Sequence, residues 1–114
     1  MKKALFFLFF TILFGCTSKK KELPADLLTH DDMVKVLVEV HILEAKVKKL
    51  YLNADSSSKV YHHYEKMLFD DLDIDKTAYE KSVAYYVDEI STYKDIYEEV
   101  VDSLLARQKV EKAR

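Results

Sequence analysis

Apolar and polar residues alternate with a helical period along most of the chain after residue 29. Thr29 is followed by Asp31 and Asp32, which together are typical of an N-cap and an acidic first helical turn. Apolar side chains then recur every three or four residues, which predicts a helix over about residues 30–52. The apolar face of this helix consists of Met33, Val36, Leu37, Val40, Leu43, Val47, Leu50 and Tyr51.

A polar stretch from Asn53 to Ser58 separates this helix from a second one. Asp55 and the serines that follow it offer several N-caps, and we expect the second helix to end near Phe69 or Asp70. Its apolar side carries Val60, Tyr61, Tyr64, Met67 and Leu68. Leu72 and Ile74 are expected to anchor the connection that comes next.

The last helical region begins at Asp75 or Lys76 and has a heptad pattern. Its apolar positions repeat with alternating steps of four and three, which favours packing against partner helices. They are Tyr79, Val83, Tyr86, Ile90, Tyr93, Tyr97, Val100 and Leu104. Either one long helix or two helices with a kink near residues 88–92 would produce this seam.

These patterns predict an all-α module of three or four helices over residues 29–106, followed by a charged tail, residues 107–114, that should fray. The only glycine of the chain is Gly15, so the remainder can form neither a phosphate-cradling loop nor a dinucleotide fingerprint. Tight hairpin turns are disfavoured for the same reason. The composition therefore supports the all-α prediction.

The N-terminus has the pattern of an export signal. Lys2 and Lys3 precede an apolar run of 11 residues, 4–14, which is about half the roughly 20 that a membrane-spanning helix needs. The run ends in Leu-Phe-Gly-Cys, which resembles a bacterial lipobox. The alternative is an ordinary secretory signal in which Cys16 occurs by chance.

The lipobox resemblance implies cleavage between Gly15 and Cys16, removal of the signal peptide (residues 1–15), and a lipid on the Cys16 sulfur. Residues 16–28 would then form a lipidated, flexible tether, and the lipid would hold the protein on a membrane. Three lysines follow Cys16 at positions 19–21 rather than acidic residues. In lipoproteins of the Bacteroidota, acidic residues at this place are associated with surface display, so the lysines favour the periplasmic side. We expect the protein on the outer membrane of a bacterial cell envelope, facing the periplasm.

Three groups of residues resemble one known family. They are Met33, Leu37, His41, Glu44 and Ala45; Tyr79, Ser82, Val83, Tyr85 and Tyr86; and Ile96, Tyr97, Val100 and Leu104. Their spacing is similar to that of small Bacteroidota lipoproteins with domain of unknown function 4296, over about residues 24–106. The family usually has Phe in place of Tyr79 and Pro in place of Ile90. The resemblance implies an exported, lipid-anchored helical module and brings no activity with it.

Charge argues against nucleic acid as a partner. Without Lys2 and Lys3 the chain has 16 basic and 20 acidic side chains, and its dense basic cluster lies in the tether. No motif for a small-molecule substrate is evident. After lipidation of Cys16 no thiol is left, and no Ser and His stand in a recognisable catalytic arrangement, so we do not expect an enzyme.

His41 and Glu44 lie three residues apart, on one face of the first helix, and Glu44 falls within its apolar stripe, where an unpaired charge would be costly. We expect a structural polar pair in which Glu44 accepts hydrogen bonds from tyrosines or a lysine of the facing helix. The alternative is a metal-binding protein or an enzyme centred on this pair, but helical carboxylate metal sites need a second such motif, which the chain lacks. Neither a metal ion nor a cofactor is predicted.

Asp71, Asp73 and Asp75 have the spacing of the first ligands in a calcium-binding EF-hand. Lys76 and Ser82, however, replace the glycine and the glutamate that the motif requires. We expect a helix end, a solvated loop and an acidic N-cap instead.

All eight tyrosines follow residue 50. We expect part of them to bury their rings, whereas Tyr51, Tyr61, Tyr64 and Tyr85 are predicted to line an aromatic groove for a peptide or a partner helix. The alternative is an ordinary core with many hydroxyl groups. The sequence thus favours an accessory subunit that binds a protein partner in the envelope; the alternative is a chaperone-like binder of exported polypeptides.

Overall fold

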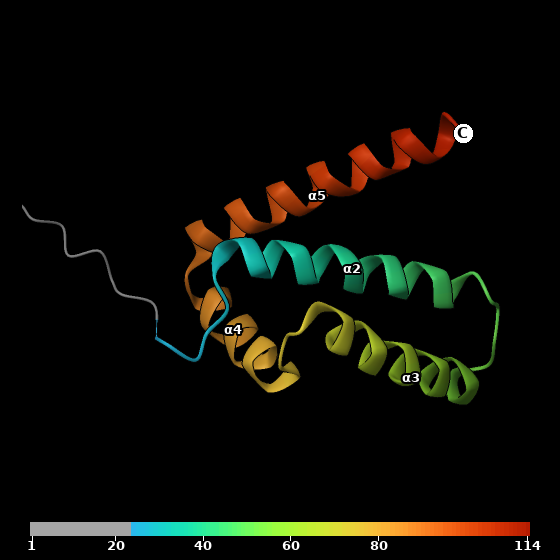
Figure 1. Cartoon of the computed structure of the whole chain (residues 1–114), viewed down its shortest axis with the longest axis horizontal. Coiled ribbons are helices and arrows are strands. Elements are labelled where there is room, and N and C mark those ends of the chain that lie inside the picture. Colours follow the sequence, from blue (N-terminus) through green and yellow to red (C-terminus); the bar gives the residue numbers. More distant parts are fainter. Residues whose placement is uncertain (1–23) are drawn as a thin grey trace, which may run out of the picture.

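The structure is a computed structural model that describes residues 24–114, and this part of the chain has four helices and no strand. The helices are α2 (His30–Lys48), α3 (Ala54–Leu72), α4 (Lys76–Asp88) and α5 (Ile90–Lys112). Figure 1 shows α2 between α3 and α5, with α4 near the start of α2. The all-α prediction is confirmed.

Polar side chains cap the first three helices at their N-termini. The side chain of Thr29 accepts a hydrogen bond from the backbone N–H of Asp32. In the same way, Asn53 accepts from the N–H of Ser56, and Asp75 accepts from the N–H of Ala78. Each cap satisfies one of the donors that a helix start leaves unpaired. The N-cap expected among residues 55–58 is therefore supplied by Asn53, and the acidic cap at Asp75 is confirmed.

The turn between α3 and α4 ends the helix without glycine. Asp73 has a left-handed backbone, and the N–H groups of Asp73 and Ile74 donate to the carbonyls of Asp70 and Phe69. Ile74 packs against the cluster of Phe69, which completes a Schellman motif. Because Asp tolerates the left-handed region better than most residues, it fills the position where a glycine is usual. The acidic run is thus a helix end and an N-cap, as expected.

Helix α2 is shorter than the sequence predicts, ending at Lys48 rather than near residue 52. The N–H groups of Leu50 and Tyr51 donate to carbonyls only three residues back, and Tyr51 adopts a left-handed backbone with φ 51°. This tight turn reverses the chain so that α3 can pack on α2. The apolar periodicity continues through the turn, and that is why it overestimates the length of the helix.

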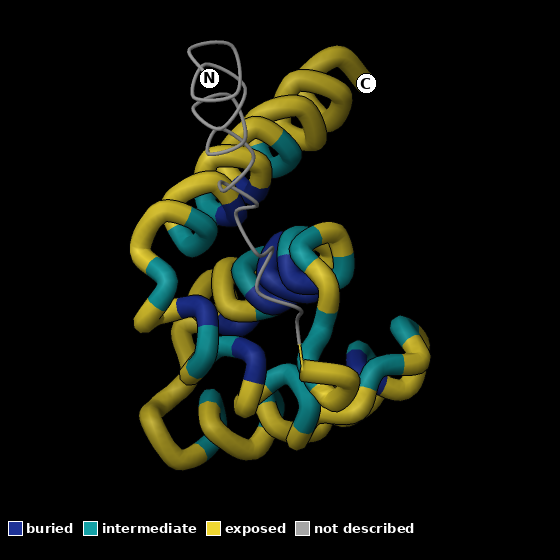
Figure 2. The backbone as a smooth tube through the Cα atoms, turned by 90° about the vertical axis from the view of Figure 1, so that its left-hand side faces the viewer, coloured by how far each residue is buried: buried dark blue, intermediate teal, exposed yellow. Residues whose placement is uncertain are grey.

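The main core cluster joins three helices. Its buried members come from α2 (Met33, Leu37, Val38), α4 (Tyr86) and α5 (Ile96, Val100). A smaller cluster of Val36, Val40 and Phe69 joins α2 to α3. Burial is accordingly concentrated on α2 in the middle of the molecule, whereas the C-terminal part of α5 is mostly exposed (Figure 2).

The last helical region consists of two helices that meet at Glu89, within the range where a kink was possible. Tyr86 and Val100 would lie about 21 Å apart along a straight helix. They reach one cluster because the chain changes direction at Glu89, whose ψ of 71° is not helical. The break also interrupts the heptad seam: Ile90, expected on the seam, is 78% exposed, whereas Ile96, outside it, is fully buried.

The folded part begins before residue 29, in the segment assigned to the tether. The N–H of Leu28 donates to Ser82 Oγ at 2.8 Å, and the Tyr86 hydroxyl donates to the Leu28 carbonyl at 2.8 Å. Ser82 is fully buried and donates in turn to the carbonyl of Ala78 at 2.6 Å. We call Leu28, Ser82 and Tyr86 the α4 clasp, since these three residues hold the incoming chain against α4.

The C-terminal residues are helical rather than frayed, because α5 continues to Lys112. Arg107 forms an ion pair with Glu39 of α2, and this contact ties the far part of α5 to the central helix. His30 and Glu99, 3.0 Å apart, connect the same two helices near the start of α2. The prediction of a frayed tail from residue 107 is wrong for this reason.

Candidate functional site

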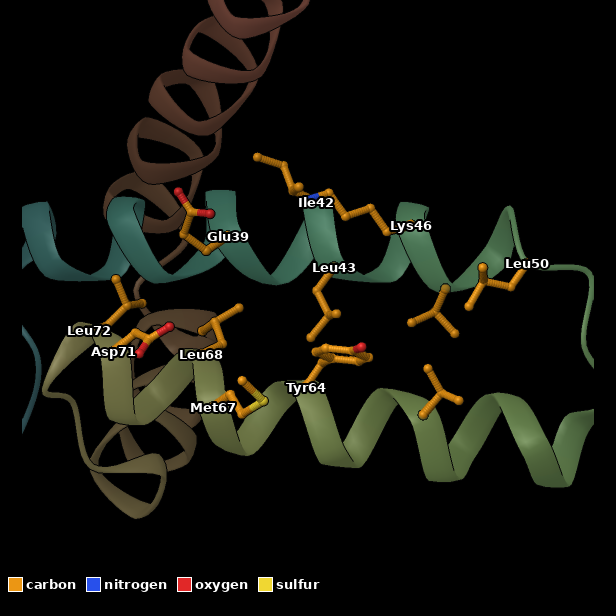
Figure 3. Close-up of a pocket in the computed structure, with 12 residues that line it drawn as sticks. Glu39, Ile42, Leu43, Lys46, Leu50, Tyr64, Met67, Leu68, Asp71 and Leu72 are labelled. Carbon is orange, nitrogen blue, oxygen red and sulfur yellow. The ribbon is translucent and has the colours of Figure 1, made fainter.

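The candidate functional site is an open apolar groove between α2 and α3, with a volume of about 440 Å³. We call it the α2–α3 groove. Its lining residues are Glu39, Ile42, Leu43, Lys46 and Val47 from α2, Leu50 from the turn that follows α2, and Val60, Tyr64, Met67, Leu68, Asp71 and Leu72 from α3. In Figure 3, Leu43 of α2 points toward Tyr64 of α3 across the floor of the groove.

The groove arises from the spacing of apolar residues on two antiparallel helices. Each helix carries more apolar positions than the contact between them can bury. Leu50, Tyr64 and Met67 remain 54%, 50% and 47% exposed, although all three are large and apolar. Single exposed apolar residues are common, but several that converge in one groove are typical of an interaction site.

Charged side chains lie on the rim. Glu39 and Asp71 stand near one end of the groove, and Lys46 stands farther along α2. Glu39 is paired with Arg107 of α5, whereas neither Lys46 nor Asp71 has an ion-pair partner within residues 24–114. The groove therefore has an apolar floor and two charges available for a bound molecule.

The four tyrosines predicted to bind a partner do not form one surface. Tyr64 lines the groove. Tyr61 lines a different hollow, together with Glu44 and Lys48. Tyr51 lies in the turn after α2 and is 93% exposed, and the ring of Tyr85 packs against the core cluster and against Tyr86 on α4. The predicted aromatic groove is thus an aliphatic groove that contains a single tyrosine.

Two other tyrosines on the α5 seam pack against each other, with the Tyr93 and Tyr97 ring centroids 4.8 Å apart and the ring planes tilted by 53°. Burial, a hydrogen bond with Tyr93 and the nearby charges of Tyr93, Tyr79 and Glu44 raise the pKa of Tyr97 to about 12. The hydroxyl is therefore held in its neutral form, which is consistent with a packing role.

A charged contact connects α3 and α4. Lys76 Nζ lies 2.6 Å from Glu65 Oε1, and the Glu65 side chain is only 13% exposed. Burial by itself would raise the pKa of Glu65, but hydrogen bonds from Lys76 and Tyr61 and the charge of Lys76 outweigh it and lower this pKa. For Tyr61, burial and the hydrogen bond to Glu65 raise the pKa of the hydroxyl. The Glu65–Lys76 contact thus connects α3 to α4, and Tyr61 supports Glu65 from within α3.

His41 and Glu44 are close together, with His41 Nδ1 and Glu44 Oε2 3.2 Å apart. Glu44 is 54% exposed, so it does not lie inside the apolar stripe, and its hydrogen bond is to His41 rather than to a facing tyrosine or lysine. The expected tyrosine or lysine partner is wrong because the half-exposed Glu44 side chain pairs with its neighbour on α2 instead. The His41 ring also meets Tyr97 edge to face, at 6.0 Å.

Within residues 24–114, no three His, Cys, Asp or Glu side chains gather where they could hold a metal ion. Over the same residues, none of the helices has both the length and the apolar content needed to cross a membrane. Gly15 and Cys16, the expected cleavage and lipidation sites, lie outside the described residues.

The sequence does show the apolar residues of the groove as apolar helix positions, but it indicates that they belong to the core. Leu43 and Leu50 belong to the predicted face of the first helix, and Met67 to that of the second. The sequence feature that could have indicated a groove is the number of large apolar residues on both helices, which exceeds what the contact between them can bury. The α4 clasp carried no such signal, since a lone buried serine has no distinctive pattern.

Comparison with known protein families assigns this fold. The family described as Domain of unknown function (DUF4296) matches residues 24–110, which include α2, α3 and α4 and all but the last two residues of α5. The chain belongs to this family. Its DUF4296 domain begins at Pro24, in agreement with the early start of the folded part at the α4 clasp. No curated protein and no solved structure shows significant similarity to the chain.

Proposed function

We propose that this DUF4296 protein is a lipid-anchored helical binding module in the bacterial cell envelope and acts as an accessory subunit of an outer-membrane protein assembly. The observation that carries the proposal is the α2–α3 groove, where Leu50, Tyr64 and Met67 remain about half exposed. Burying such a surface against a partner releases ordered water and stabilises the complex.

The anchoring part of the proposal rests on the N-terminal sequence. The apolar run of residues 4–14, followed by Gly15 and Cys16, supports export and lipid attachment. The lysines at positions 19–21 support an orientation toward the periplasm, since surface-displayed lipoproteins are associated with acidic residues at this place. The same lysines can rest on anionic head groups near the anchor. The tether would then present the groove to proteins of the same membrane.

A capture experiment with the full-length lipoprotein tests the proposal. Met67→Glu places a charge on the groove floor, and Val87→Glu places the same charge on α4, at a side chain with nearly equal exposure, 49% against 47%. Protein is recovered from its native envelope in mild detergent, and co-purifying proteins are quantified by mass spectrometry.

We expect one stoichiometric membrane partner with the wild type and with Val87→Glu, and at least a tenfold loss of it with Met67→Glu. Circular dichroism checks that both variants keep their helix content. A broad set of exported proteins in place of one partner would replace the subunit by a chaperone-like binder. Equal capture by all three proteins would refute the groove as the binding site.

A further inference from the structure

We propose that the molecule held in the α2–α3 groove is an amphipathic α-helix of about three turns from the partner protein, with its N-terminal end toward Glu39 and Asp71. This inference rests on the proposed function and specifies the chemistry of its partner. It follows from the length of the groove, the nature of its walls and the charges on its rim.

The length of the groove matches a short helix. Its lining runs from Glu39 to Leu50 along α2 and from Val60 to Leu72 along α3, in opposite directions. At about 1.5 Å per residue, each wall is roughly 17 Å long. About eleven or twelve residues of a third helix cover this length, and a third helix laid over two antiparallel ones is the arrangement of a three-helix bundle.

The walls of the groove favour a helix over an extended peptide. Both walls are helices, so their backbone N–H and C=O groups in the middle of the groove are already paired within each helix. An extended segment would find no strand edge to pair with and would leave its own backbone groups unpaired on an apolar floor, which is costly. A helix satisfies its backbone internally and needs only an apolar face.

The rim charges give the bound helix a direction. Glu39 and Asp71 lie at one end, and of these two only Asp71 lacks an ion-pair partner in the described part of the chain. The N-terminus of a helix carries a partial positive charge and its C-terminus a partial negative one. The N-terminal end of the bound helix therefore belongs near Asp71, and an acidic side chain farther along the helix can reach Lys46.

Site-specific photo-crosslinking in the native envelope measures this geometry. p-Benzoylphenylalanine is placed, one position at a time, at Leu50, at Met67 and at Leu72 of the full-length lipoprotein, and the crosslinked residues are mapped by mass spectrometry. Leu50 and Met67 are about half exposed, so these two substitutions leave the core intact and carry the test if Leu72 does not tolerate the change.

For a bound helix, the crosslinks from Leu50 and Met67 fall about seven residues apart in one segment of the partner, and those from Leu50 and Leu72 about twelve apart. For an extended segment, the crosslinks from Leu50 and Met67 would fall about three residues apart, and those from Leu50 and Leu72 about five or six apart. We expect the helical spacing, with the Leu72 crosslink on the N-terminal side. The extended spacing, or the reverse order, would overturn the proposal.

The charge on the rim is tested with Lys46→Glu, and Lys48→Glu provides the same charge change on α2 outside the groove. We expect Lys46→Glu to reduce the crosslink yield from Leu50 and Met67 several-fold and Lys48→Glu to leave it unchanged. Equal yields in the two variants would contradict the proposed contact between Lys46 and an acidic side chain of the bound helix.

The remaining outcomes separate this inference from the proposed function. Crosslinks to lipid, or to α5 of a second copy, whose Val101 and Leu105 are about half exposed, would overturn the inference. If the partner still co-purifies but no groove position crosslinks to it, the inference fails and the accessory-subunit function remains. If no partner is captured at all, the proposed function fails as well.

Discussion

At the residue scale, Ser82 shows how a single hydroxyl can hold a domain boundary in place. It is fully buried on α4, accepts from the Leu28 N–H and donates to the Ala78 carbonyl. Within the described residues, no buried side-chain nitrogen or oxygen lacks a hydrogen-bond partner. Removing this hydroxyl would create an unpaired donor at a position that water reaches poorly.

We expect Ser82→Ala to lower the free energy of unfolding by about 1–3 kcal/mol, the cost of leaving a buried N–H unpaired. Ser58→Ala, at an exposed position of α3, is the control and should change it by less than about 0.5 kcal/mol. Urea denaturation followed by circular dichroism measures both. Equal stability of the two variants would show that the α4 clasp contributes nothing.

At the element scale, the break at Glu89 decides which side chains of the last region enter the core. The heptad pattern runs through residue 90 without interruption, yet Ile90 is exposed and Ile96 is buried. The local sequence pattern does not reveal this change of direction, because the chain has neither Gly nor Pro near the break. Packing of α4 and α5 on the same part of α2 produces it.

The two isoleucines provide a direct test of this break. We expect Ile96→Ala to cost about 2–5 kcal/mol, because it leaves a cavity in the core. Ile90→Ala should cost less than about 0.5 kcal/mol, because the side chain is largely in solvent. Chemical denaturation of both variants measures these losses of unfolding free energy. If the region formed one continuous seam rather than two helices, Ile90→Ala would cost more than Ile96→Ala.

The contact between α3 and α4 should make stability depend on pH. The folded-state pKa of Glu65 lies below its ordinary value of 4.5, so the ionised form is favoured by folding. This contribution is fully present above about pH 5 and is lost as the pH falls below 4.5 through the lowered pKa. Glu65→Gln should therefore flatten the acid part of the curve of unfolding free energy against pH.

Glu111→Gln, at an exposed position of α5 that has no ion pair with another residue of 24–114, is the matched control and should keep the wild-type curve. Denaturation midpoints between pH 3 and pH 7 supply the comparison. If the wild type and Glu65→Gln lose stability in parallel as the pH falls, the contact between Glu65 and Lys76 has no effect on the balance between the folded and unfolded states.

At the scale of the whole molecule, the distribution of charge along the chain bears on the proposed lipid anchor. Residues 24–114 contain 13 basic and 19 acidic side chains, whereas residues 19–21 are all lysine. In the proposed arrangement, an anionic membrane surface attracts the tether and repels the acidic body of the domain. The lipid on Cys16, rather than the folded part, would then be responsible for membrane association.

Cys16→Ser tests this arrangement. We expect the variant to leave the membrane fraction, because each acyl CH₂ that is no longer buried removes about 0.8 kcal/mol of binding. Its thermal unfolding curve should match that of the wild type, since Cys16 lies outside the helical domain. Ser18→Ala is the control and should stay on the membrane.

Continued firm association of Cys16→Ser after the partner has been deleted would contradict lipid anchoring. Mass spectrometry of the N-terminal peptide, which should carry the lipid on Cys16 and lack residues 1–15, provides an independent measurement. An unmodified Cys16 would support the alternative of an ordinary secretory signal.

The helices themselves could be predicted because their causes are local. Apolar spacing within a few residues, the cap at Thr29, the acidic cap at Asp75 and the lack of glycine after Gly15 specify an all-α chain and the approximate position of each helix. The resemblance to domain of unknown function 4296 had the same basis, and membership of this domain family is confirmed over residues 24–110.

Only the tertiary structure decided which faces of these helices are covered. It separates Tyr51, Tyr61, Tyr64 and Tyr85, exposes Glu44 and leaves the α2–α3 groove open. The physical reason is that a helix follows from interactions between residues close in sequence, whereas burial depends on how distant helices cross. Thus apolar positions alone could not distinguish a core residue such as Ile96 from a groove residue such as Met67.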